Sequence, residues 1–551
     1  MPDITGATVL ARSLKQQGVD YMFGIVGFPV IPVANAAQRE GITFIGMHNE
    51  QAAAYAAQAA GYLTGRPQSC LVVSGPGVIH ALGGLANARE NCWPMLLVGG
   101  ASETYQAGMG AFQEERQVLA ATPYSKYAMA IDRVDRIPYY VEQAVRTSLY
   151  GRPGPAYLDM ADDIIRGTAS DDAVPTTASV PPPPRPQAAP ADIDAALAAL
   201  QRAERPLVII GKGMAWARAE AEVREFIERT QLPFLATPMG KGVVSDAHPA
   251  SVGAARSYAL KNADLVLLLG ARLNWMLHFG LPPRFAPDVK VVQIDIAAEQ
   301  VGHNVPAEVA LVGDGRSIMA QLNAALAAAP WSCPGESPWR DGIARKSAEN
   351  ATAVAGMAND DRAPMNYYRA LRDLREAMPA DAIIVSEGAN TMDIGRTQLP
   401  NSEPRTRLDA GTYGTMGVGL GFAVAAAVTN PGRPVIALEG DSAFGFSGME
   451  METICRYNLP VTVVIFNNGG IVAGMVKPPA PGEQLPPYAL SRTARYEQLA
   501  EAFGGRGFYV EKPSDLRPAL DKAISSGGPS IVNVLLDARA DRKPQEHFWK
   551  A

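Results

Sequence analysis

Two stretches decide the fold of this chain: LEGDSAFGFS at residues 438–447 and VTVVIFNNGG at residues 461–470. In each stretch a short apolar run ends in polar residues and glycines, a pattern that predicts a buried strand leading into a loop at the edge of a parallel sheet. Asp441 follows the first run, and Asn468 comes 27 residues later, after the second. That spacing fits one strand–helix–strand crossover. The two side chains are therefore expected to meet where neighbouring strands end.

The same alternation of Val-, Ile- and Leu-rich runs with Ala-rich segments of helical length extends over most of the 551 residues. Two breaks in composition divide it: a Pro-rich stretch at 171–191, typical of an extended linker, and a connecting segment at 329–364 that is able to form a helix. We predict an α/β protein with three doubly wound parallel-sheet domains, at 1–170, 190–330 and 365–540. Strands are expected at 21–26, 44–47, 70–73, 95–98, 156–159, 207–210, 265–269, 289–294, 383–386, 435–439, 461–466 and 531–535.

Composition excludes several classes of protein. Apolar residues make up 47% of the chain and charged residues 19%, as in folded globular proteins, and the net charge of −6 argues against a protein that coats nucleic acid. The most apolar stretch, 417–428, is shorter than the roughly 20 residues that span a bilayer, so it predicts a buried helix. The four cysteines form no C-x-x-C pair and no secretory signal is visible. We expect a cytoplasmic protein without nucleic-acid or membrane partners.

The polar residues at the two strand ends suit a divalent cation. Mg²⁺ prefers oxygen ligands and commonly shares the oxygens of a diphosphate. Asp441 supplies a carboxylate and Asn468 an amide oxygen, while Gly469 and Gly470 would let the backbone turn sharply and present a carbonyl. The sequence therefore predicts magnesium bound by Asp441, Asn468 and Gly470.

Gly-Asp-Ser followed at this distance by Asn-Asn resembles the cofactor motif of thiamine-diphosphate-dependent enzymes, in which Asp, Asn and a backbone carbonyl hold magnesium against the diphosphate. The resemblance implies the decarboxylase-type fold, with an N-terminal pyrimidine-binding domain, a middle domain and a C-terminal diphosphate-binding domain. It also implies an N-terminal glutamate that hydrogen-bonds the aminopyrimidine ring. Glu50, at the start of an Ala-rich helix, matches that position, although an acid there also offsets the helix dipole.

Further segments resemble the family's cofactor loops: VGFP at 26–29, SGPG at 74–77, SEGANT at 386–391 and GTYGTMGVGLG at 411–421. In the last of these, Met416 is the bulky apolar residue expected beneath the cofactor. His80, after the Gly-Pro-Gly turn, is interpreted as structural. The cofactor contacts implied by the resemblance are Gly27, Pro29, Glu50, Gly388, Asn390, Thr391, Thr415, Met416, Gly440, Asp441, Ser442, Ala443, Asn468, Gly470 and Ile471.

The middle block most resembles the subgroup of oxalyl-CoA decarboxylase and 2-hydroxyacyl-CoA lyase. The segments that carry this resemblance are GKGM at 211–214, LGARLNW at 269–275 and VQIDI at 292–296. In that subgroup the middle domain holds the ADP portion of CoA, and ADP is expected here as an activator or as a mimic of CoA. The implied CoA contacts are Arg152, Lys212, Arg272, Asp295, Asp314 and Arg396, although each alone also fits a solvated surface charge.

Phe112 and Gln113 favour the lyase, because the decarboxylase usually has Tyr-Glu at these positions. We predict cleavage of a 2-hydroxyacyl-CoA to formyl-CoA and an aldehyde or ketone, reversibly, with Glu50, Phe112, Gln113 and Glu114 as catalytic residues. A neutral Gln can orient the substrate hydroxyl but accepts a proton poorly. The base is left open between the cofactor imine, Glu114 and Glu115.

Three alternative functions remain: an oxalyl-CoA decarboxylase, an acetolactate-synthase-like enzyme and a non-catalytic CoA-binding protein. The resemblance further implies a homodimer or homotetramer whose active sites lie at the dimer interface, with Glu50 of one subunit facing the diphosphate site of the other. The tail at 541–551 mixes basic and aromatic residues, and resembles a lid that closes over CoA.

Overall fold

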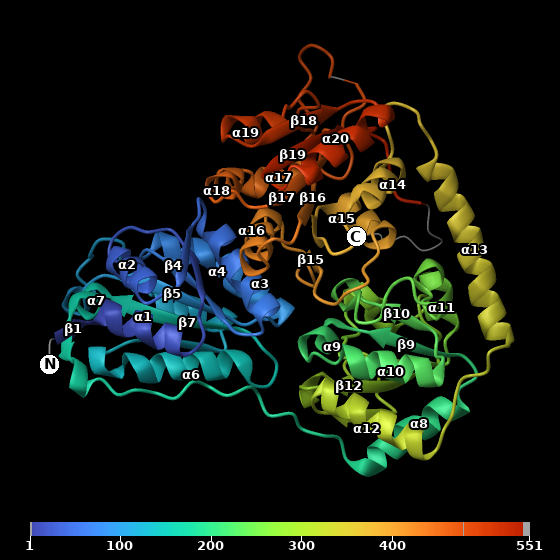
Figure 1. The fold of residues 1–551 in the computed structure, drawn as a ribbon, viewed down its shortest axis with the longest axis horizontal. Helices are drawn as coiled ribbons and strands as arrows, with labels where there is room; N and C mark the ends of the chain where they lie inside the picture. The colour runs from blue at the N-terminus through green and yellow to red at the C-terminus, as the bar shows by residue number, and fades with distance from the viewer. Residues whose placement is uncertain (1–2, 478, 544–551) are drawn as a thin grey trace.

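The computed structural model describes residues 3–477 and 479–543. Three sheets, each covered by helices, form the three lobes of the molecule in Figure 1. Every strand pair within these sheets is parallel, and a small antiparallel pair joins β1 (Asp3–Thr5) to β8 (Thr168–Ser170). The expected class, three doubly wound α/β domains, is confirmed.

The N-terminal sheet has six strands in the order β3-β2-β4-β5-β7-β6. Their bounds are β2 (Tyr21–Gly24), β3 (Thr43–Gly46), β4 (Gln68–Val72), β5 (Met95–Ala101), β6 (Tyr127–Ala130) and β7 (Pro155–Ala161). Successive residues of a strand point to opposite faces. One face packs on α1 (Gly6–Gln16), α2 (Ile31–Arg39) and α6 (Ile137–Leu149), and the other on α3 (Glu50–Thr64), α4 (Pro76–Asn91) and α5 (Gln117–Ala121).

The C-terminal sheet repeats this strand order as β15-β14-β16-β17-β19-β18. Its strands are β14 (Ile383–Glu387), β15 (Arg407–Asp409), β16 (Val435–Gly440), β17 (Val461–Asn467), β18 (Arg506–Val510) and β19 (Ser530–Leu535). Helices α14 (Tyr367–Ala377), α15 (Ala389–Gln398) and α20 (Pro513–Ser525) cover one face; α16 (Gly419–Thr429), α17 (Asp441–Ser447), α18 (Glu450–Arg456) and α19 (Glu497–Ala502) lie on the other.

The middle sheet has the order β10-β9-β11-β12-β13. Its elements are α8 (Pro190–Arg202), β9 (Pro206–Ile210), α9 (Lys212–Trp216), α10 (Glu220–Thr230), β10 (Phe234–Ala236), α11 (Arg256–Asn262), β11 (Leu265–Leu269), β12 (Lys290–Asp295), β13 (Val309–Val312) and α12 (Gly315–Ala328). Helix α13 (Pro338–Ala358) then runs along the outside of the molecule to the C-terminal domain, as Figure 1 shows. It forms within the segment expected to connect these two domains.

The N- and C-terminal domains share one hydrophobic core. Helix α16 is buried from Gly419 to Ala427 and packs against α3, as expected for the most apolar stretch of the sequence. Ligands of doubly wound sheets bind at the carboxyl ends of strands where the chain order reverses. In the C-terminal sheet this point lies between β14 and β16, where Glu387, the last residue of β14, is paired in register with Glu439, the residue before the last of β16.

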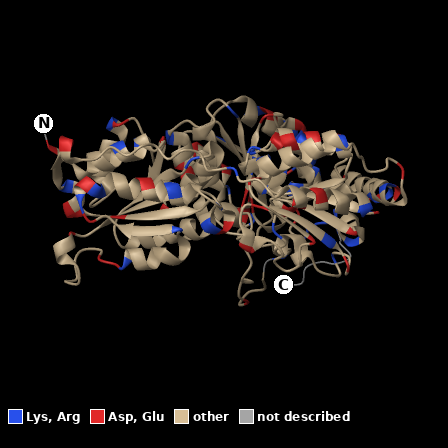
Figure 2. Ribbon diagram, turned by 90° about the horizontal axis from the view of Figure 1, so that it is seen from below, with Lys and Arg blue, Asp and Glu red and all other residues tan. Residues whose placement is uncertain are grey.

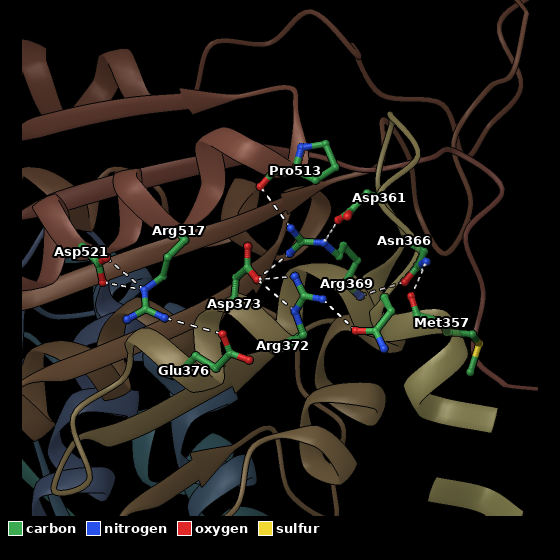
Figure 3. A network of polar contacts seen from close by, with 11 residues as sticks. Met357, Asp361, Asn366, Arg369, Arg372, Asp373, Glu376, Pro513, Arg517 and Asp521 are labelled. Carbon is green, nitrogen blue, oxygen red and sulfur yellow. Dashed lines mark hydrogen bonds and ion pairs between the residues drawn. The ribbon is translucent and has the colours of Figure 1, made fainter. Parts of the chain in front are cut away.

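Buried polar contacts fix α14 to the rest of the C-terminal domain (Figure 3). The Arg369 guanidinium is 6% exposed and pairs with the carboxylates of Asp361 and Asp373. It also donates to the carbonyl of Pro513 at 3.4 Å, which joins α14 to the start of α20. Removing one partner of such a pair would leave an uncompensated buried charge. These contacts therefore fix the position of α14 relative to α20.

Basic and acidic residues are interspersed along the molecule in Figure 2 instead of being gathered by sign on one side of that view. Among the described residues, every helix is too short or too polar to cross a membrane.

Candidate active site

The two predicted metal ligands lie together. Strands β16 and β17 are neighbours, and the Asp441 carboxylate accepts the N–H groups of Gly469 at 2.8 Å and Gly470 at 3.1 Å. The Asn468 side-chain oxygen accepts the same Gly470 N–H at 3.1 Å. Burial raises the pKa of Asp441 to about 6, even though these hydrogen bonds oppose the shift. A bound cation would stabilise the ionised form of such a buried carboxylate.

The donor set fits a magnesium ion that shares diphosphate oxygens. Asp441 and Asn468 are each 3% exposed and offer one carboxylate and one amide oxygen, beside the predicted carbonyl of Gly470. Among residues 3–477 and 479–543, no cluster of three His, Cys, Asp or Glu side chains is placed to bind a metal. The site therefore suits a cation that completes its coordination with ligand oxygens and water.

The loop after β14 lies against this turn. A side chain at Gly388, where φ is 101°, would contact the backbone of Gly440. The Asn390 side-chain amide donates to the carbonyl of Val472 and to the carboxylate of Asp541, at 3.5 and 3.3 Å. Thr391 also lies beside Gly440, and Ile471 is half exposed at the same edge. The predicted cofactor residues from 388 to 391 and from 440 to 471 thus surround one site, with Ser442 and Ala443 in the first turn of α17.

The loop that carries Met416 is fixed from two sides. The Asn87 amide of α4 donates to the Thr415 hydroxyl at 2.7 Å. The Glu387 carboxylate accepts the N–H groups of Gly417 and Gly419, where α16 begins. Burial raises the pKa of Glu387 to about 7. The sequence analysis missed this carboxylate, although an acid at the end of an apolar strand is an unusual placement.

Glu439 lies next to Glu387 on the neighbouring strand and is fully buried. Both of its carboxyl oxygens are without hydrogen-bond partners in the described structure. Burial, with repulsion from Glu387 adding to it, raises the pKa of Glu439 well above its ordinary value. The shift favours the protonated form of Glu439, whereas Glu387 binds the backbone of the Met416 loop.

Glu50 is the first residue of α3, and the preceding Asn49 caps the helix by accepting the N–H of Gln51. The Glu50 carboxylate lies 3.1 Å from Nδ1 of His80 on α4. The His80 side chain is 60% exposed and pairs with this carboxylate, and its interpretation as a structural residue stays a prediction. The described contacts of Glu50 include no hydrogen bond or ion pair to the Asp441 turn of the same chain.

Helix α18 of the C-terminal domain holds the loop that precedes Glu50. The Glu450 carboxylate is buried and accepts the N–H groups of His48 and Asn49, each at 3.0 Å. The Tyr457 hydroxyl accepts the N–H of Gly46 at 3.0 Å. Because α18 follows α17 directly, the segment that begins with the predicted metal ligand Asp441 also fixes the start of α3.

The segment with Phe112 and Gln113 lies beside the Gly-Pro-Gly turn. The Gln113 side chain is 3.0 Å from the Ser74 hydroxyl, and its backbone would block any side chain at Gly75. Phe112 is 66% exposed and makes an edge contact with Phe28, between Gly27 and Pro29 of the first predicted loop. The predicted N-terminal residues are thus brought to one edge of the sheet.

Glu114 does not fit its predicted role as a base. Its carboxylate accepts the N–H groups of Gly108, Gly110 and Ala111, and these bonds lower the pKa of Glu114. A carboxylate that caps its own loop in this way is a weak proton acceptor. Sequence reasoning could not detect the cap, because it depends on the backbone conformation of the loop.

A buried network behind these loops was also missed. The Gln117 side chain accepts the N–H of Gly75 and donates to the Asp159 carboxylate at 2.8 Å. The Tyr157 hydroxyl donates to the same oxygen of Asp159 at 3.2 Å. Burial raises the pKa of Asp159 to about 6. The network ties the turn at Gly75 to the end of β7.

Three of the predicted CoA contacts gather where the N-terminal and middle domains meet. Arg152 pairs with both carboxylate oxygens of Asp295, at 2.9 and 3.0 Å. Lys212 donates to the carbonyl of Asn91, and Arg272 to that of Glu90 at 2.8 Å. Burial lowers the pKa of Lys212 to about 8, and both arginines add to the shift. An anion bound here would offset the repulsion between Lys212 and the two arginines.

A pocket of about 450 Å³ adjoins Arg272, with Glu90, Trp275, His303 and Tyr413 among its walls. These residues come from all three domains. Asp314, the remaining predicted contact in the middle domain, caps α12 by accepting the N–H of Ser317 at 3.0 Å. One oxygen of this carboxylate is therefore engaged within the protein.

Arg396 belongs to a second basic cluster, between the middle and C-terminal domains. It pairs with Asp409 and Asp393, each at 2.9 Å. Burial lowers the pKa of Arg256 to about 10, and the nearby charges of Arg284 and Arg396 add to the effect. The sequence analysis missed Arg256 and Arg284, because no motif connects them to Arg396.

Comparison with known proteins gives matches over the whole chain. Three profiles of the thiamine pyrophosphate enzymes match consecutive parts: the N-terminal TPP binding domain at 4–121, the central domain at 193–322 and the C-terminal TPP binding domain at 388–534. The chain is 50% identical to 2-hydroxyacyl-CoA lyase 1 of Mus musculus over 559 residues, covering 99% of this chain and 96% of that protein. It is 50% identical to 2-hydroxyacyl-CoA lyase 1 of Homo sapiens, covering 99% and 97%, and 43% identical to oxalyl-CoA decarboxylase of Escherichia coli (strain K12), covering 97% and 95%.

Proposed function

Because the chain belongs to the thiamine pyrophosphate enzymes, as a member of the group that contains 2-hydroxyacyl-CoA lyase and oxalyl-CoA decarboxylase, we propose that it cleaves a 2-hydroxyacyl-CoA to formyl-CoA and an aldehyde or ketone. The observation that carries the proposal is the pair of turns at Asp441 and Asn468, joined by hydrogen bonds at the ends of adjacent strands. The 50% identity to 2-hydroxyacyl-CoA lyases over nearly their whole length favours this activity over decarboxylation.

Asp441, Asn468 and Gly470 would hold Mg²⁺ and, through it, the diphosphate of thiamine diphosphate. In the first turn of α17 the Ser442 N–H donates to the Asp441 carboxylate at 2.9 Å, and the backbone N–H of Ala443 would bind a phosphate oxygen. When bound, the cofactor supplies a carbon nucleophile for the thioester carbonyl and accepts the electron pair of the bond that breaks. The protein's part is to hold the reactants, exclude water and move protons.

Glu50 would hydrogen-bond the aminopyrimidine ring, as the family resemblance implies. In this chain Glu50 faces His80, and its described contacts do not include the Asp441 turn. We therefore propose a homodimer or homotetramer in which Glu50 of one subunit approaches the diphosphate site of another. The contacts of α18 with the loop before Glu50 would hold the acid in place within its own chain.

Two basic clusters are available for the phosphates of CoA. Arg396 lies on α15, the helix that begins beside the diphosphate site with Asn390, so we assign the CoA phosphates to Arg396 and its neighbour Arg256. The cluster of Arg152, Lys212 and Arg272 would bind a nucleotide diphosphate such as ADP, as an activator or as a CoA mimic.

The tail that was expected to close as a lid begins at 541, and residues 544–551 lie outside the described part of the chain. At its start, Arg542 donates to the Asn390 side chain at 2.9 Å and pairs with Asp393. The Lys543 N–H donates to the Tyr368 hydroxyl at 2.8 Å. These contacts place residues 542 and 543 beside α14 and α15, and we propose that the tail closes over the bound thioester.

The test is incubation of the magnesium- and cofactor-loaded enzyme with a 2-hydroxyacyl-CoA and, separately, with oxalyl-CoA. Formyl-CoA and the carbonyl product are measured by mass spectrometry, and carbon dioxide is measured in parallel. We expect formyl-CoA with the aldehyde or ketone from the first thioester. Glu50→Gln should abolish turnover while leaving the fold and CoA affinity intact. Carbon dioxide from oxalyl-CoA, with no cleavage of the hydroxyacyl thioester, would establish the decarboxylase instead.

A further inference from the structure

We propose that His80 is the general base that removes the proton from the hydroxyl group of the substrate, held for this task by its contact with Glu50. This inference rests on the proposed function, because only a 2-hydroxyacyl thioester carries a hydroxyl that must lose its proton as the carbon–carbon bond breaks. The other protein groups considered for the role are poorly suited: Gln113 is an amide and Glu114 caps its own loop. The Glu115 carboxylate accepts the N–H of the following residue at 2.7 Å, so it too is engaged by its own loop.

The geometry of the pair sets the tautomer of the imidazole. A carboxylate can only accept, so the contact of 3.1 Å between Glu50 Oε2 and His80 Nδ1 places the hydrogen on Nδ1. The lone pair is then on Nε2, and the His80 side chain is 60% exposed while Glu50 is 15% exposed. A partly buried acid thus orients an exposed imidazole, the arrangement that makes histidine a base.

His80 also lies at the correct edge of the sheet. It is in the first turns of α4, which begins at Pro76 directly after the turn that contacts Gln113. Of the described histidines, it alone contacts Glu50. A substrate hydroxyl oriented by Gln113 would therefore approach the same loop end that presents the imidazole.

The step balances without another reactant. His80 Nε2 takes the hydroxyl proton, and the O–H electron pair becomes the second bond of the new carbonyl group. The electron pair of the broken carbon–carbon bond goes to the thioester carbon, where the bound cofactor would stabilise it. The imidazolium then returns the proton to that carbon, which gives formyl-CoA and neutral His80. In the direction of condensation the same imidazolium protonates the new alkoxide.

The test uses His80→Ala in the loaded enzyme, with His248→Ala as the matched control. His248 also pairs with a glutamate, Glu228 at 2.9 Å, but lies in the middle domain. A general base contributes roughly 10²–10⁴-fold to rate. We expect kcat of His80→Ala to fall by about that factor, with KM little changed, and free imidazole to restore a measurable part of it. The control should keep the wild-type rate.

A second measurement distinguishes a base that acts on the substrate from a residue that only positions Glu50. Hydrogen–deuterium exchange at the reactive carbon of the bound cofactor, followed by NMR after acid quench, depends on Glu50 and requires no substrate. We expect His80→Ala to exchange at the wild-type rate and Glu50→Gln to exchange slowly. The inference is overturned if His80→Ala turns over within about threefold of wild type, or if its exchange slows in parallel with kcat. Failure of the wild-type enzyme to make formyl-CoA would instead refute the proposed function.

Discussion

Replacing Asp159 by Asn should stabilise the protein above pH 6. Burial raises the pKa of the Asp159 carboxyl from 3.8 to about 6, against the opposing hydrogen bonds from Tyr157 and Gln117. About two pH units at about 1.4 kcal/mol each give a penalty of about 3 kcal/mol for the ionised side chain. The folded state binds this proton more tightly than the unfolded state, so the penalty is absent below about pH 4 and fully present above about pH 6.

The hydrogen bonds from Gln117 and Tyr157 both reach Oδ1 of Asp159, so the amide oxygen of Asp159→Asn can accept them too. We expect an unfolding temperature raised by about 2–3 °C at pH 8, with little change near pH 4, measured by circular dichroism. Asp135→Asn is the control, because Arg133 lowers the pKa of that exposed carboxylate and the variant should gain nothing. An unfolding temperature at pH 8 no higher than that of wild type would refute the reasoning.

Three further outcomes are expected. In Gly419→Ala the added methyl group would overlap the Glu439 carboxyl, so the variant should lose at least about 1–3 kcal/mol of stability and bind the cofactor more weakly. The control is Gly356→Ala, which has open space around it and should be neutral or slightly stabilising. Stability is measured in a chemical denaturation series. Arg256→Met should raise KM for the CoA thioester about tenfold with kcat nearly unchanged in steady-state kinetics, and an unchanged KM would exclude this cluster from CoA binding. Chelation of divalent ions should abolish activity, and added Mg²⁺ should restore it in the wild type but not in Asp441→Ala; activity that survives chelation would contradict the metal assignment.

Central strands were predictable from the sequence and most edge strands were not. Strands such as β9 and β11 are continuous apolar runs, because both faces of a parallel sheet are covered. The strands without a prediction in the three parallel sheets, β6, β10, β13, β15 and β18, all lie at sheet edges. Several are only three or four residues long, and an edge strand has fewer neighbours to require apolar side chains.

The site was predictable where neighbouring strand ends carry polar residues, as at Asp441 and Asn468, because topology brings such ends together. Contacts between distant loops left no comparable signal. Arg256 and Arg396 meet only when the middle and C-terminal domains pack, and nothing in their local sequences indicates it. The contacts of Glu450 with the loop before α3 likewise depend on two domains sharing one core.

The run from Asp441 through Glu450 to Tyr457 has a consequence for assembly. In the proposed dimer, each polypeptide would give its acid to one reaction centre and its metal ligands to the other, and this short stretch would link the two. Cofactor binding at the first centre would then change cofactor affinity at the second, so the binding isotherm should differ from that of two independent sites. Mixed dimers carrying one altered copy of Glu450 would reveal such coupling as a change in the rate of the unaltered partner.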